Sequence, residues 1–304
     1  AFELWTEVTD IDPSRVIRCG KKDNFWEMGE TGPCGPCSEI HYFIGENLDE
    51  QESSGVNVSD QYWELWNLVF IQSNRLPDGS LEDLPAKHVD TGAGLERIAT
   101  ILQGKTSNYD TDLFLPIIDK IQNIAGSSYS QDPIPHRVIA DHLRMLCFSI
   151  ADGALPSNDG RGYVLRRILR RAARFGRKIG LEKPFLHGLV DIVGEMMGEL
   201  YPEVLQKKSH IQKVLLSEEE SFGHTLDRGL NHFEKIYSGI GYEKVISGSA
   251  AFKLYDTYGF PLDLTQLMAR ERGLRVEEEE FNSLMNEQKK NCLLYTSPSP
   301  RDTR

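Results

Sequence analysis

The spacing of apolar and polar residues changes about a third of the way along the chain. Before residue 104, apolar residues form short runs rich in aromatic and β-branched side chains, of which residues 62–71 (YWELWNLVFI) are the most pronounced. A turn signal at 76–79 (LPDG) follows, then a second strand at 88–91 and a helix start over 95–102. This succession predicts an antiparallel sheet rather than a parallel βαβ unit.

From residue 104 onward the apolar residues recur at helical spacing. The pattern predicts helices over 137–151, with Gly153 as a stop, over 163–178 and over 210–237. The last of these carries one apolar stripe, made of Ile211, Val214, Leu215, Phe222, Leu226, Leu230, Phe233 and Ile236. We therefore expect an α+β chain.

Two acidic runs and the chain ends complete this pattern. The runs 218–220 and 277–280 are predicted to be solvated helix faces. Residues 2–5 look like the middle of an amphipathic helix and no Met precedes them, so the chain is expected to start inside a larger protein. Residues 292–304 resemble translated adapter sequence, and we interpret them as a non-native tail.

Composition narrows the class of protein. The 304 residues are 39% hydrophobic and 26% charged, with no run of 18 apolar residues, so neither a membrane span nor a membrane partner is expected. Five cysteines, an odd number, fit a reducing compartment. A cytoplasmic location is expected, and an organellar form is not excluded. The net charge of −12 argues against a general nucleic-acid binder.

Residues 89–97 (VDTGAGLER) are the segment most suggestive of chemistry. Asp90 can pair with an ammonium group, and Gly92 and Gly94 allow a ligand close to the backbone. Arg97 offers a planar fork of donors suited to phosphate oxygens. The segment could hold an amine beside a polyphosphate. The alternative is an ordinary strand-to-helix turn with a surface arginine.

Residues 23–40 (DNFWEMGETGPCGPCSEI) are rich in glycine and proline and predict an irregular loop, to which Trp26 gives a flat apolar wall. Cys34 and Cys37 with His41 are zinc-ligand types at short spacing. No second ligand pair follows at zinc-finger spacing, and no strand–CxxC–helix unit frames a redox pair. A structural loop is therefore favoured, and no metal site is predicted.

Asn67 lies in the predicted strand and faces the same side as Val69. A polar group among apolar neighbours needs a hydrogen-bond partner, which a ligand or the backbone could supply.

The predicted helix 163–178 is strongly basic. Between residues 161 and 178 there are eight basic residues and no acidic one. Its polar face holds Arg166, Arg167, Arg170, Arg171, Arg174, Arg177 and Lys178, opposite an apolar face of Leu165, Ile168, Leu169, Ala172 and Phe175. Such a face is a candidate surface for a phosphate backbone. The alternative is a solvated face paired with acidic neighbours.

Two short segments carry residue types that read base edges. Asn158 precedes the basic helix, and Asp256 lies in 255–260 (YDTYGF). Asn and Asp are equally suited to capping helices and forming turns.

Taken together, the segments resemble the alanyl-tRNA synthetase family. The resemblance rests on 23–40, 66–70, 89–97, 137–150 with its ADHxR sequence, 151–171 and 254–264, in the family's order, and it covers about residues 1–291. It implies the C-terminal part of a class II catalytic domain over 1–103, built on an antiparallel sheet. Residues 104–291 would be a helical domain that recognises the tRNA acceptor stem.

The resemblance also implies roles, with ATP and Mg²⁺ as cofactors and L-alanine and tRNA(Ala) as partners. Arg97 and Asp90 would be catalytic. Alanine would be bound by Asn67, Val69, Asp90 and Gly92. ATP would be bound by Trp26, Trp66, Asn67, Gly94 and Arg97. The acceptor stem, with its G3·U70 pair, would be read by Asn158 and Asp256 and its phosphates held by Arg166, Arg167, Arg170, Arg171 and Arg174.

The sequence departs from the family pattern in three ways. Residue 93 is Ala where many members carry Met. The first two class II motifs would lie before Ala1, and the editing domain with its zinc site after residue 291, so zinc is not expected. A truncated alanine–tRNA ligase with little activity in adenylate formation is therefore expected. A non-catalytic module that binds the acceptor stem is the alternative.

Overall fold

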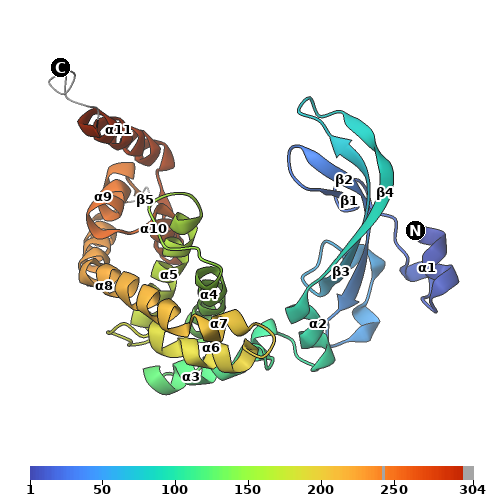
Figure 1. The fold of residues 1–304 in the computed structure, drawn as a ribbon, viewed down its shortest axis with the longest axis horizontal. Coiled ribbons are helices and arrows are strands. Elements are labelled where there is room, and N and C mark those ends of the chain that lie inside the picture. Colours follow the sequence, from blue (N-terminus) through green and yellow to red (C-terminus); the bar gives the residue numbers. More distant parts are fainter. Residues whose placement is uncertain (242–243, 297–304) are drawn as a thin grey trace. The chain divides into compact units, whose positions relative to one another are not determined.

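The computed structural model describes residues 1–241 and 244–296, with the side chains of 289 and 291–296 excepted (Figure 1). The chain divides into two compact units, Ala1–Leu113 and Phe114–Arg304. A sheet dominates the first unit and helices dominate the second, which confirms the α+β class.

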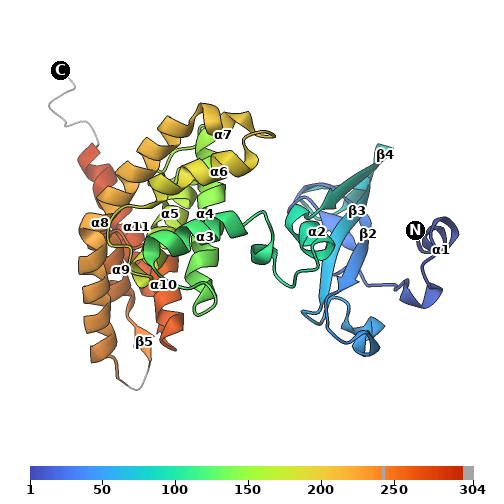
Figure 2. The same cartoon turned by 90° about the horizontal axis from the view of Figure 1, so that it is seen from below.

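The first unit contains helices, 3-10 helices and the sheet strands. They are α1 (Phe2–Val8), η1 (Pro13–Arg15), β1 (Phe25–Glu27), β2 (Gly32–Phe43), η2 (Leu48–Glu50), η3 (Ser53–Gly55), β3 (Tyr62–Arg75), β4 (Leu81–Ala93), α2 (Leu95–Leu102) and η4 (Asn108–Asp110). The described strands pair antiparallel in the order β1-β2-β3-β4, which confirms the predicted antiparallel sheet. Figure 2 shows β2, β3 and β4 in this order, with α2 directly after β4.

The turn between β3 and β4 follows from its sequence. Gly79 has φ of +84°, a conformation that glycine adopts without steric cost, and its N–H donates to the Leu76 carbonyl at 2.9 Å. Asp78 accepts from the backbone N–H of Ser80 at 2.9 Å. This tight turn lets β4 return along β3 from Arg75 to Trp66, and both strands are longer than the sequence predicts.

The prediction of an irregular loop over 23–40 is wrong, because β1 and β2 occupy most of it. Proline lacks an N–H and usually interrupts a sheet. Here the β2–β3 register shifts between Cys34 and Cys37, so Pro36 lies where the ladder to β3 is already interrupted. Gly35 is required beside it, because a Cβ there would lie 1.9 Å from the Phe70 carbonyl oxygen.

The second unit is built from helices with one short parallel strand pair among its described residues. The elements are α3 (Leu115–Ala125), α4 (Pro133–Ala151), α5 (Gly160–Lys178), η5 (Leu186–Leu189), α6 (Val190–Met197), α7 (Pro202–Gln206), α8 (Lys208–Gly239), β5 (Val245–Ile246), α9 (Gly248–Tyr258), α10 (Leu262–Glu271), β6 (Arg275–Val276) and α11 (Glu278–Thr296). The three predicted helices are confirmed as α4, α5 and α8, each beginning two to four residues earlier than predicted.

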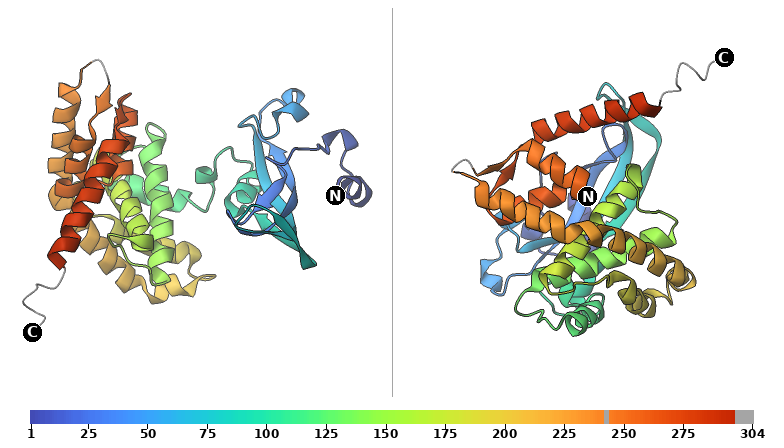
Figure 3. Two further views of the ribbon diagram at one scale, coloured as in Figure 1. Left: turned by 90° about the horizontal axis from the view of Figure 1, so that it is seen from above. Right: turned by 90° about the vertical axis from the view of Figure 1, so that its left-hand side faces the viewer.

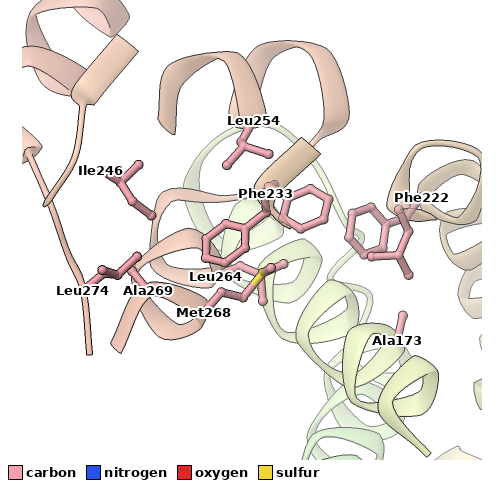
Figure 4. Close-up of a cluster of buried hydrophobic side chains, with 11 residues drawn as sticks. Ala173, Phe222, Phe233, Ile246, Leu254, Leu264, Met268, Ala269 and Leu274 are labelled. Carbon is pink, nitrogen blue, oxygen red and sulfur yellow. The ribbon is translucent and has the colours of Figure 1, made fainter. Parts of the chain in front are cut away.

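The long helix α8 organises this unit, and it packs against α4, α5, α6 and α9. Its apolar stripe is buried at Ile211, Leu215, Phe222, Leu226 and Phe233. Figure 4 shows Phe222 and Phe233 meeting side chains of α9 and α10 and Ala173 of α5. Helix α11, red in Figure 3, packs on α9 through ring contacts of Phe281.

The acidic run 218–220 of α8 is not the solvated face that the sequence predicts. Glu219 is buried, the Glu218 side chain is 12% exposed, and only Glu220 is exposed. Position 219 falls on the apolar stripe, four residues after Leu215 and three before Phe222. Helical spacing alone therefore predicts that this side chain is buried. In the second run, 277–280, the first three residues are exposed as predicted.

The C-terminal helix α11 continues through residues 292–296, the first part of the proposed tail. Residues 297–304, the rest of that tail, lie outside the described residues. Over the part of the chain that the structure describes, no helix combines the length and apolar character needed to cross a membrane.

Candidate functional site

Four side-chain positions of β3 and β4 share one face of the sheet. Asn67 lies directly opposite Gly92, and Val69 directly opposite Asp90. On its other side Asn67 lies opposite Glu39 of β2. Directly opposed residues of an antiparallel pair point to the same face, as do residues two apart on one strand. The structure therefore brings together the four residues expected to line an alanine site.

The amide of Asn67 is held in one orientation. Its Nδ2 donates to Glu39 Oε1 at 3.0 Å and to Glu64 Oε1 at 3.4 Å. The second oxygen of Glu39 lies 2.9 Å from His41 Nε2. Since ionised carboxylates only accept hydrogen bonds, Nδ2 must face them. Asn67 Oδ1 is buried and lacks a partner among the described residues, so it is an acceptor still to be satisfied.

The face is apolar at its centre and open at its edge. Val69 is 7% exposed, whereas Asp90 and Gly92 are exposed on β4. A Cβ added at Gly92 would meet no heavy atom within 4 Å. The arrangement offers a carboxylate and open space above a buried methyl surface, which suits a small cationic amine.

Arg97 lies in the first turn of α2, directly after β4. Its Nη1 donates to the Glu64 backbone carbonyl at 2.6 Å, and its side chain lies along Gly94. Gly94 in turn donates its N–H to the Leu65 carbonyl at 3.1 Å. These bonds tie the start of α2 to β3. A guanidinium has five N–H donors, so this carbonyl contact leaves others for phosphate oxygens.

Neither of the two tryptophans expected at the ATP site lies beside Asn67 on the face that carries Val69 and Asp90. Trp66 lies opposite Ala93, one residue from Asn67, and so points to the other face. Trp26 is half-buried on β1, opposite Gly35, with β2 between it and β3. The register therefore does not bring either ring next to Asn67, and their contacts with ATP stay predictions.

Cys34 and Cys37 lie buried on β2 as free thiols. Burial and the neighbouring Glu39 carboxylate, whose oxygen lies 3.7 Å from the sulfur, raise the pKa of Cys37 to about 11. A thiol that stays protonated is a poor metal ligand. The described residues contain no group of three or more His, Cys, Asp or Glu side chains placed to hold a metal ion.

The basic face of α5 is largely paired with acidic residues from other helices. The ion pairs are Arg166–Glu218, Arg167–Asp263, Arg170–Glu218, Arg174–Glu271, Arg177–Asp227 and Lys178–Asp132. The expectation of a free basic face rested on the absence of acids within 161–178, and the partners come from α8 and α10 as well as from the residue before α4. In the described part of the chain, Arg171 has no acidic partner. The role of this face toward RNA stays a prediction.

The two residues expected to read bases are both exposed in the second unit. Asn158 precedes α5 and accepts a hydrogen bond from Arg166. Asp256 lies in the last turn of α9 and accepts from Gln288 of α11. Each side chain is thus held by a neighbour while one edge faces solvent.

Three carboxylates that support these residues, Glu39, Glu64 and Glu218, were not predicted from the sequence. Glu39 lies opposite Asn67 only because of the β2–β3 register, which a local pattern does not reveal. Glu64 precedes Asn67 by three residues, and the β3 bulge near Leu65 brings its oxygen to the amide. Glu218 accepts hydrogen bonds from arginines that lie 48 and 52 residues earlier in the chain, so no local pattern reveals these contacts.

The chain is similar to known proteins over almost its whole length. Residues 1–293 match the family described as tRNA synthetases class II (A). Alanine–tRNA ligase of Chlorobium chlorochromatii is 55% identical over 299 residues, which cover 95% of this chain and 33% of that protein. The same-named proteins of Lawsonia intracellularis and Magnetococcus marinus are 49% and 48% identical over 95% of the chain and 34% of their own length. The chain thus spans about a third of these relatives.

Proposed function

The chain belongs to the class II alanyl-tRNA synthetase family, and we propose that it forms part of an enzyme that activates L-alanine with ATP and transfers it to tRNA(Ala). The observation that carries this proposal is the pairing of Asn67 with Gly92 and of Val69 with Asp90 on one sheet face.

The alanine site is proposed to lie on this face. Asp90 would pair with the α-ammonium, and Asn67 Oδ1 would accept one of its N–H bonds. Val69, buried and branched, would contact the methyl group, and Gly92 leaves space for the ligand backbone. Opposite charge and a held amide give orientation, which is the main contribution that a protein makes to such a reaction.

The ATP site is proposed to adjoin it, with Arg97 and Gly94 at the start of α2 toward the phosphates and Trp26 and Asn67 around the nucleotide. The ring of Trp66 points to the other face of the sheet, so its predicted contact with ATP is not part of this arrangement. Mg²⁺ takes oxygen ligands and is usually bound by one or two carboxylates together with substrate phosphates. Glu39 and Glu64 present carboxylate oxygens at Asn67 and would hold it in that way. The ion would neutralise charge on the phosphates.

Two displacements complete the proposed reaction. An alanine carboxylate oxygen attacks the α-phosphorus of ATP, forming alanyl-adenylate and releasing pyrophosphate. A terminal ribose hydroxyl of the tRNA then attacks the adenylate carbonyl carbon, forming the ester and releasing AMP, whose phosphate takes up the hydroxyl proton. Asp90 and Asn67 hold the amino acid through both steps, and Arg97 stabilises negative charge on the phosphates.

The second unit is proposed to bind the tRNA acceptor stem. Asn158 and Asp256 would read the G3·U70 pair, and Arg166, Arg167, Arg170, Arg171 and Arg174 would provide positive potential for the phosphates. Ion-paired arginines keep unused N–H donors, whereas in the described part of the chain no carboxylate offsets the positive charge of Arg171.

L-alanine binding by the whole chain tests the site, measured by calorimetry together with alanine-dependent ATP–pyrophosphate exchange. Asp90→Asn should weaken alanine binding at least about tenfold, since a hydrogen bond between charged groups is worth about 1.5–3 kcal/mol. Asp83→Asn is the matched control, because Asp83 is also exposed on β4. Equal alanine affinity in Asp90→Asn and wild type would exclude the proposed ammonium site. Binding of acceptor-stem RNA without any binding of L-alanine would favour the non-catalytic module.

A further inference from the structure

One carboxylate, that of Glu218 on α8, binds two guanidinium groups of α5. Glu218 Oε1 accepts from Arg166 Nε at 2.8 Å and from Arg170 Nη2 at 3.0 Å, and Oε2 accepts from Arg166 Nη2 at 3.1 Å. The side chains of Glu218, Arg166 and Arg170 are 12%, 20% and 15% exposed. Charge-assisted bonds of this kind, shielded from water, are stronger and more directional than surface ion pairs.

Each arginine continues to a second partner. Arg166 donates through Nη1 to Asn158 Oδ1, so its guanidinium lies between Glu218 and Asn158. Arg170 donates through Nη1 to the Gly259 carbonyl, just beyond the end of α9. Its guanidinium also lies over the Phe222 ring, 5.0 Å from the ring centroid, which restricts its orientation further.

The end of α9 is shaped to receive Arg170. Gly259 has φ of +69°, the left-handed conformation that terminates helices, and Phe260 N–H donates to the Leu254 carbonyl at 3.0 Å. A Cβ at Gly259 would lie 2.7 Å from Arg170 Nη1. Asp256 lies three residues before Gly259 on the same helix. Arg170 therefore fixes the helix end that carries Asp256.

We propose that Glu218 is a positioning residue that sets Asn158 and Asp256 at the separation needed to contact one RNA base pair. Two hydrogen-bonded branches start at its carboxylate, one through Arg166 to Asn158 and one through Arg170 to the end of α9. The inference rests on the proposed function of Asn158 and Asp256 as readers of the acceptor stem. Glu218 itself touches no RNA.

The charge of Glu218 is essential to this arrangement. Burial lowers the pKa of Arg170, and the Glu218 carboxylate opposes that shift. A neutral amide at position 218 could accept at one oxygen only, and its NH₂ group would face a guanidinium that also donates. Glu218→Gln should therefore release at least one branch and let both guanidinium groups repel one another.

The experiment compares the affinity of the whole chain for two RNA hairpins that differ only in the third base pair, G·U or G·C. The measured quantity is the Kd for the G·C hairpin divided by the Kd for the G·U hairpin. Glu218→Gln should lower this ratio at least about fivefold, the lower end of what one base contact is worth. It should have no further effect in a chain that already carries Asn158→Ala and Asp256→Ala. Exposed Glu220→Gln, on the same helix, is the matched control.

A second variant covers a loss of folding in Glu218→Gln. Arg166→Lys keeps the positive charge but cannot bind Glu218 in a bidentate manner and Asn158 at the same time. It should lower the Kd ratio while leaving the Arg170 branch intact. Thermal unfolding of every variant shows whether it is folded at the binding temperature.

The outcomes separate the inference from the function on which it rests. If Asn158→Ala lowers the ratio while Glu218→Gln and Arg166→Lys leave it unchanged, or weaken both hairpins equally, the positioning role is overturned and base reading stands. If neither Asn158→Ala nor Asp256→Ala changes the ratio, base reading is overturned and the positioning role with it. A ratio lowered by all of these variants but not by Glu220→Gln supports both.

Discussion

Val69 lies directly opposite Asp90, so a buried methyl surface and an exposed carboxylate adjoin on one face of the sheet. In the proposed site the first contacts the substrate methyl and the second its ammonium. The size of residue 69 should then decide which small amino acid is accepted.

Val69→Ala should shift preference from alanine toward 2-aminobutyrate, and Val69→Ile toward glycine. One methylene in an apolar pocket is worth roughly 1–3 kcal/mol, so each shift should be about 5- to 150-fold. Relative affinities for glycine, alanine and 2-aminobutyrate measure it. Val89→Ala, on the other face of β4 and 65% exposed, should leave the order unchanged. An unchanged order in both Val69 variants would place the methyl group elsewhere.

Gly92 and Gly35 should respond differently to the same substitution. Gly92→Ala should leave the free energy of unfolding within about 0.5 kcal/mol of wild type, since its Cβ would meet nothing within 4 Å. It should still weaken alanine binding, because the methyl group would fill the ligand's space. Gly35→Ala should cost roughly 1–3 kcal/mol or more, since its Cβ would lie 1.9 Å from the Phe70 carbonyl oxygen. Urea unfolding and calorimetry distinguish the two, and normal alanine binding by Gly92→Ala would contradict the proposed site.

The helices and strands of this chain are easier to predict from its sequence than the contacts between residues that are far apart along it. β-Branched and aromatic composition revealed β3, and helical spacing revealed α4, α5 and α8, because these signals are local. The opposition of Asn67 to Glu39 depends on a register set by distant turns and a bulge, and residues 32–43 pair as a strand despite two prolines. Likewise the charge of α5 is local, whereas Glu218 and Glu271, which neutralise part of it, come from other helices.

Glu219 should make folding stability depend on pH near neutrality. Its oxygens accept from the backbone N–H groups of Phe185 and Leu186 at 3.0 and 3.1 Å, and burial raises its pKa to about 7. The folded state therefore holds a proton that the unfolded state, with a pKa near 4.5, releases. The stabilisation from this group is present below pH 4.5 and is lost as pH rises through 7, by about 3 kcal/mol in total.

The difference in unfolding free energy between wild type and Glu219→Gln isolates this contribution. Wild type should lose stability relative to the variant between pH 5 and 8, as measured by urea unfolding at several pH values. Glu220→Gln, at an exposed position on the same helix, is the matched control. A Glu219→Gln difference that is flat, or that rises with pH, would show that Glu219 is ionised in the folded state.

Arg171 and Arg174 should contribute unequally to RNA binding, because their electrostatic surroundings differ. Arg174 forms an ion pair with Glu271, whose pKa the hydrogen bond from Arg174 holds below its usual value. Arg171 has no acidic partner in the described part of the chain, and its Nε is buried without one. Each phosphate neutralised by a cation changes the slope of log K against log salt by about 0.9 for a duplex. Arg171→Gln should therefore reduce this slope by about one for an acceptor-stem hairpin, and Arg174→Gln by less.

Glu271→Gln should make the salt dependence steeper, because it frees Arg174. Arg272→Gln, which breaks an ion pair with Glu234 outside α5, is the control. Equal slopes for Arg171→Gln and wild type would mean that the phosphates do not lie along this face of α5.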